Sequence, residues 1–136
     1  MRFELTFLPN IRNNMAKNQK NKRTTDLQIE LYSTIYPLLK SLFTEIKDFS
    51  KKNQNDPINL SKVKIINRLL IKAKDILKDE SSIEYLDILE EDNLPSMSDA
   101  VLIVSQYISA LDKFHSDHYK YEDSFGLAWD NPGHWQ

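Results

Sequence analysis

Apolar residues recur along most of this chain at the spacing of an amphipathic helix. In residues 31–49 they return every three or four positions, which is the period of one helix face. The same period runs through residues 66–77 and again through residues 97–118. These three stretches predict three long helices, each with one side facing a common core.

Capping residues and a proline predict how the first helix begins and continues. Thr24, Thr25 and Asp26 are candidates for its N-cap, because their side chains can accept from the free N–H groups of a first turn. Pro37 lies inside the helical pattern and lacks a backbone donor. The pattern therefore predicts either one kinked helix or two helices that meet near Ser33–Thr34.

Polar segments separate the later helices. Residues 51–58 predict a polar loop before a second helix that continues to about Lys78. Ser81 and Glu84 have the spacing of a capping box, which predicts a short acidic helix after it. The last helix is expected to run to about Tyr121.

The two ends of the chain lack the helical period. Residues 1–24 are mostly polar and basic and are expected to form a disordered, flexible arm. Residues 123–136 hold both Gly and both Trp and are expected to form an aromatic tail packed on the domain formed by residues 25–122. The prediction is an all-α protein: a small up-and-down bundle of three to five helices with a basic arm and an aromatic tail.

Composition narrows the classes of function. Without any Cys there is no disulfide, no thiolate metal site and no Cys nucleophile. The longest apolar run in the middle of the chain, residues 101–104, is far too short to cross a bilayer. Neither a Gly-rich phosphate loop nor a nucleophile elbow is present. We therefore expect a cytoplasmic, non-catalytic protein without a cofactor or a membrane partner.

Charge is divided between the two halves of the chain. Residues 1–78 hold 16 Lys and Arg against 7 Asp and Glu, a net charge of +9. Residues 79–136 hold 2 against 13, a net charge of −11. Charge of one sign gathered on one segment must face a partner, the other segment or water.

The second predicted helix carries a basic face. Lys64, Arg68, Lys72 and Lys78 share one side of it, with Ile71 as an apolar residue among them. Three interpretations stay open for this face: contact with nucleic acid phosphates, contact with an acidic protein, or pairing with the acidic half of the same chain. Nucleic acid is not favoured, because no aromatic residues alternate with these Lys and Arg residues and no helix-turn-helix signal precedes them.

The tail is the most aromatic part of the chain. Phe125, Trp129 and Trp135 lie beside acidic residues and a Pro-Gly turn. Large rings of this kind are typical of interface anchors, so they are candidate partner-binding residues together with Ile71. The alternative is that they fold back and close an open end of the bundle, since burial of each ring is worth a few kcal/mol.

Two histidines and a glutamate raise a third hypothesis. His115, His118 and Glu122 are spaced three and four residues apart and share one helix face, as ligands of a divalent metal can. A second ligand motif on another helix is missing, so the simpler interpretation is a helix end where His replaces Leu and interacts with the dipole.

Together these features predict a small helical interaction or regulatory protein that binds another protein or a second copy of itself. A nucleic-acid-associated accessory protein that uses the arm and the basic helix is the first alternative. A metal-binding bundle centred on His115, His118 and Glu122, with or without enzymatic activity, is the second.

Overall fold

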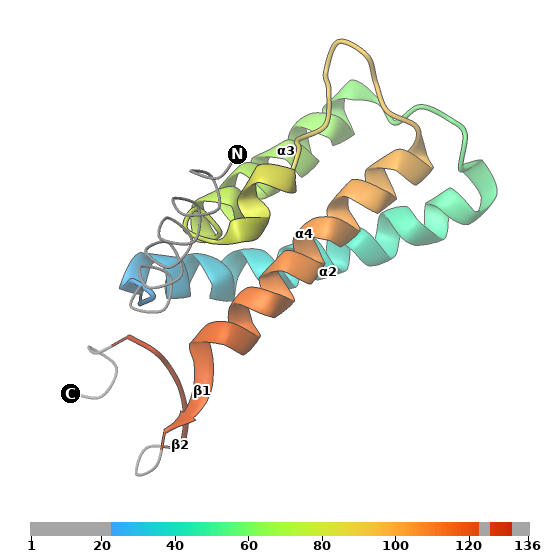
Figure 1. The fold of residues 1–136 in the computed structure, drawn as a ribbon. Coiled ribbons are helices and arrows are strands. Elements are labelled where there is room, and N and C mark those ends of the chain that lie inside the picture. The colour runs from blue at the N-terminus through green and yellow to red at the C-terminus, as the bar shows by residue number, and fades with distance from the viewer. Residues whose placement is uncertain (1–22, 123–125, 132–136) are drawn as a thin grey trace, which may run out of the picture.

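The structure, a computed structural model, describes residues 23–122 and 126–131, with the side chains of residues 120–122, 126 and 127 excepted. The elements are α2 (Asp26–Asn53), α3 (Leu60–Ile76), the 3-10 helix η1 (Ser81–Tyr85), α4 (Met97–His118), and strands β1 (Tyr119–Glu122) and β2 (Gly126–Trp129). Three α-helices dominate the described chain, which confirms the predicted small all-α bundle (Figure 1).

Helix α2 is the element on which the others assemble. It begins with a capping box: Thr25 Oγ1 accepts from the N–H of Gln28 at 3.1 Å, and the Thr25 N–H donates to Gln28 Oε1 at 2.9 Å. Pro37 lies inside one uninterrupted helix, so the alternative of two helices meeting near Ser33–Thr34 is wrong. Both Pro37 and Ser33 are exposed, and water can therefore satisfy the Ser33 carbonyl that has no helical donor.

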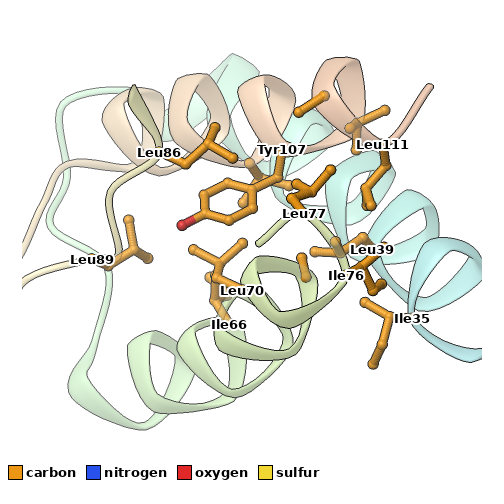
Figure 2. Close-up of a cluster of buried hydrophobic side chains, with 14 of the residues drawn as sticks. Ile35, Leu39, Ile66, Leu70, Ile76, Leu77, Leu86, Leu89, Tyr107 and Leu111 are labelled. Carbon is orange, nitrogen blue, oxygen red and sulfur yellow. The ribbon is translucent and has the colours of Figure 1, made fainter. Parts of the chain in front are cut away.

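Helices α3 and α4 both pack against α2 and contact each other much less. The space between them is filled by the segment that follows α3. There Leu86 and Leu89 are buried beside Tyr107 of α4 and Leu70 of α3 (Figure 2). The core therefore contains three helices and one non-helical segment.

The chain between α3 and α4 differs from its prediction. The capping box of Ser81 and Glu84 does not form, and the short acidic helix is replaced by η1 and the irregular residues 86–90, which begin with an extended Leu86. Asn67 holds this stretch by donating to the Leu89 carbonyl and accepting from the Leu89 N–H, both at 2.8 Å. The Tyr107 hydroxyl donates to the Asp87 carbonyl at 2.8 Å. These tertiary hydrogen bonds favour this irregular backbone over local helix.

Helix α4 ends earlier than the sequence predicts. It begins at the Ser96 cap, whose hydroxyl accepts from the Asp99 N–H at 3.1 Å, and it ends at His118 instead of about Tyr121. Strands β1 and β2 form an antiparallel pair in which Tyr119 lies opposite Trp129. The predicted tail therefore contains a strand, and its partner strand takes the residues expected for the last helical turn.

The ends of the chain are described only in part. Of the predicted arm, residues 1–22 lie outside the described residues, while Thr24 is buried against the bundle. Phe125 and Trp135 of the tail also lie outside them. Within the described helices, none combines the length and apolar character needed to span a bilayer.

Candidate functional site

The cations of α3 form an exposed row. Lys64, Arg68 and Lys72 follow one another at intervals of four residues, so they lie on one side of the helix and all are exposed. Lys78 is also exposed but comes after the last residue of the helix. We call Lys64, Arg68 and Lys72 with their apolar neighbours Ile65 and Ile71 the α3 face.

The α3 face does not pair with the acidic half of the same chain in the described residues. No ion pair within 4.0 Å joins a Lys or Arg of α3 to a carboxylate there. The pairs that do form involve Lys51, Lys113 and His118. The charge of the α3 face therefore meets solvent, although the acidic residues follow α3 directly in sequence.

Apolar side chains flank these cations. Ile65 and Ile71 are 50% and 49% exposed, which is high for two isoleucines on one short helix. Consecutive residues on a helix are 100° apart, so in a view along the axis Ile71 lies about 20° from Lys64 and Ile65 about 20° from Lys72, on the two sides of the row of cations. The α3 face is therefore both cationic and apolar.

An apolar groove of about 290 Å³ adjoins the α3 face on the side of α2. Phe49, which is half exposed, and Leu42 line it from α2, and Ile65 belongs both to the groove and to the α3 face. Lys62 Nζ lies 5.0 Å from the centroid of the Phe49 ring, a cation–π distance. Sequence reasoning missed this groove. The signal available was that Ile65, like Ile71, falls outside the inward arc of its helix.

Trp129 lies on its own bundle. Its side chain is 8% exposed, and its ring meets Tyr32 of α2 edge-on at 5.3 Å and Phe114 of α4 at 5.7 Å. His115 and Tyr119 complete the cluster at 5.3 and 5.4 Å from the same ring. In this conformation Trp129 covers the end of the bundle and has little surface left for a partner.

The two histidines of α4 have different surroundings. His115 stacks between Tyr32 and Tyr119, at centroid distances of 5.5 and 4.7 Å. His118 is buried between two carboxylates, with Nε2 3.1 Å from Glu80 and Nδ1 2.6 Å from Asp130. The hydrogen bond with Glu80, assisted by Asp130 and opposed by burial, raises the pKa of His118 to about 8.

A metal site receives no support from this geometry. Both ring nitrogens of His118 are occupied by Glu80 and Asp130, and the Glu122 side chain lies outside the described residues. Among the described side chains, no group of three His, Asp or Glu residues is placed to hold a metal ion.

Asp130 links its own segment to two others, at Thr24 and at His118, a junction that sequence reasoning also missed. Its Oδ1 accepts from the Thr24 N–H at 3.0 Å and from the Thr24 hydroxyl at 2.8 Å, while its Oδ2 meets His118. The adjacent Asn131 donates to Asp26 at 2.9 Å. Partners 106 residues apart leave no local signal, so a single sequence could not have indicated them.

Comparisons with known proteins leave the chain without a family. No family model, no curated protein and no solved structure matches it.

Proposed function

We propose that this protein is a non-catalytic interaction protein that binds an acidic protein partner through the α3 face and the adjoining groove. The observation that carries the proposal is a helix face with three exposed cations, which make no ion pair with the described residues, and two half-exposed isoleucines, continuous with an apolar groove. A solvated surface that only keeps a protein in solution needs the cations but not the isoleucines.

The cations supply attraction and orientation. Within α3 there are five Lys and Arg residues and one acid, so the helix presents a local positive potential. Complementary charge on a partner raises the rate of encounter and fixes the register of the complex, and both effects weaken as salt screens them. Lys64, Arg68 and Lys72 need not break an ion pair with any described residue before they meet such a partner.

The apolar residues supply the area that is removed from water. Burial of apolar surface contributes roughly 25 cal/mol per Å². Ile65, Ile71 and Phe49 all retain about half of their accessible surface in the free protein. A partner with apolar side chains framed by Asp and Glu would cover these three residues and place its carboxylates near the cations.

The test is capture of the partner by tagged protein from its own lysate, with and without nuclease. We expect the wild-type chain to retain one dominant acidic protein after nuclease treatment, and the Lys64→Glu/Arg68→Glu variant to lose it. Lys51→Glu/Lys52→Glu is the matched control, since it makes the same charge change at exposed positions near the end of α2. Equal capture by both variants would refute the proposal.

Nucleic acid is the second candidate, favoured by the spacing of one cation per helical turn, about 6 Å, along α3. The adjoining groove argues against it, because phosphates gain nothing from Leu42 or Ile65. Fluorescence anisotropy with labelled single-stranded and duplex oligonucleotides separates the two. Binding that falls steeply with salt and disappears in Lys64→Glu/Arg68→Glu would support the nucleic acid candidate instead.

A further inference from the structure

The chain carries an acidic surface as well as a cationic one, and the two match. Residues 84–92, which we call the acidic segment, hold five Asp and Glu and no Lys or Arg. We propose that the acidic partner of the α3 face is the acidic segment of a second copy of this chain, in a reciprocal two-fold dimer. This inference rests on the proposed function, because it names the partner of the same surface.

The acidic segment presents apolar side chains in the same way as the α3 face. Tyr85 is 72% exposed and Ile88 43%, and Ile88 lies between the exposed acids Asp87 and Glu90. Leu86 and Leu89 of the same stretch point into the core. The segment therefore shows carboxylates and an isoleucine outward while its buried leucines hold it in place.

The acidic segment is fixed before any partner arrives. Asn67 holds the backbone of Leu89 with two hydrogen bonds, and Tyr107 holds the Asp87 carbonyl. A surface that is already ordered loses less conformational entropy on binding, so more of its contact energy appears as affinity. This stretch is thus a pre-formed recognition element.

The two surfaces agree in length as well as in charge. From Lys64 to Lys72 the helix rises about 12 Å, at 1.5 Å per residue. From Asp87 to Glu90 the chain spans at most about 10 Å, at 3.3 Å per residue. Cations on one copy can therefore face carboxylates on the other while Ile88 covers Ile71 or Ile65.

In the described residues the acidic segment forms no ion pair with the α3 face of its own chain. Asn67, which anchors it, is buried on the inner side of α3, one residue and 100° from the exposed Arg68. In the described residues no carboxylate of the segment comes within 4.0 Å of an α3 cation. Ion pairing of the two surfaces therefore requires a second molecule.

The position of the anchor also predicts the symmetry. Because Asn67 fixes the acidic segment beside α3, the two surfaces lie next to each other on one molecule, and the segment runs alongside α3 (Figure 1). A two-fold axis between two copies then lets each α3 face meet the other copy's acidic segment, and both contacts form at once. Such a contact closes at two copies.

The test uses two charge-reversed variants of the full chain and sedimentation equilibrium. At about 50 mM salt we expect the wild-type chain to reach twice its 16.0 kDa mass with rising concentration, and to return to one copy at about 500 mM salt. Lys64→Glu/Arg68→Glu alone and Asp87→Lys/Glu90→Lys alone should each stay monomeric, because like charges then face each other. An equimolar mixture of the two variants should form a 1:1 dimer, since each copy again meets opposite charge.

The mixture also controls for folding. A variant that fails to fold cannot form a dimer with the other variant, so a 1:1 dimer shows that both variants are folded. A wild-type chain that stays monomeric at low salt would overturn the inference, and so would a dimer that both variants form unaided. Monomeric wild-type protein that still captures a different acidic protein through the α3 face would overturn this inference and leave the proposed function standing. A wild-type chain that neither dimerises nor captures another acidic protein through the α3 face would overturn both this inference and the proposed function.

Discussion

At the scale of single residues, His118 is a buried side chain with a carboxylate at each of its two ring nitrogens. It lies between Glu80 and Asp130 at the point where the end of α4, the segment after α3 and the residues after β2 meet. When protonated, its ring donates to a carboxylate from each nitrogen. The charged form therefore stabilises the junction that holds Trp129 over the end of the bundle.

This environment predicts a fall in stability as pH rises. The pKa of His118 in the folded protein is raised from 6.5 to about 8, so its contribution is fully present below pH 6.5 and is lost as pH passes through about 8. We expect the free energy of unfolding to drop by about 1–2 kcal/mol over this interval. Denaturant unfolding between pH 6 and pH 9 measures it.

His118→Gln is the control for that series, because glutamine keeps a donor but does not titrate in this range. Its unfolding free energy should be lower at pH 6 and nearly level up to pH 9. A wild-type stability that stays constant or increases over the same interval would contradict the role assigned to His118.

Trp129 gives a second prediction at this scale. Its ring is buried against α2 and α4, so Trp129→Ala should lower the free energy of unfolding by about 3–5 kcal/mol. Leu27→Ala, at a side chain that is 63% exposed in α2, should change it by less than about 0.5 kcal/mol. Urea denaturation of both variants decides the matter, and equal effects would show that Trp129 is not part of the core.

At the scale of elements, the helices follow from local sequence and the connections between them do not. The 3.6-residue period predicts α2, α3 and α4, and Thr25, the N-cap of α2, is one of the three candidates that the sequence offers. The irregular residues 86–90 depend on Asn67, which is 22 residues from Leu89, and no local pattern records that contact. Strands of four residues, as in β1 and β2, are too short to show an alternation.

Asn67 should therefore matter more than a buried polar residue usually does. Asn67→Leu leaves the N–H and the carbonyl of Leu89 buried without partners, and we expect a loss of about 2–4 kcal/mol of unfolding free energy. Tyr107→Phe removes only the hydrogen bond to the Asp87 carbonyl and should cost about 1 kcal/mol. Thermal unfolding of the pair is the measurement, and a smaller effect for Asn67→Leu would show that the segment is held by its leucines alone.

At the scale of the whole molecule, the division of charge is visible in the sequence, but its consequence is not. Net charges of +9 and −11 on the two parts of the chain are compatible with internal pairing or with a partner. The structure decides for the described residues, since α3 makes no ion pair there and exposed isoleucines flank its cations. The groove beside Phe49 and Ile65 is a product of packing between two helices, which a wheel of either helix alone does not display.

The central claim is that the α3 face binds an acidic protein, and cross-linking from that face tests it most directly. A photoreactive residue placed at Ile71 in the native cell should give one nuclease-resistant adduct with an acidic protein, which the further inference identifies as a second copy. The same probe at Leu27, an exposed residue near the start of α2, should not give it. The adduct should vanish in Lys64→Glu/Arg68→Glu while the unfolding free energy changes by less than about 0.5 kcal/mol, because neither side chain makes an ion pair with the described part of the chain. An adduct that forms equally from Leu27, or that survives the charge reversal, would contradict the claim.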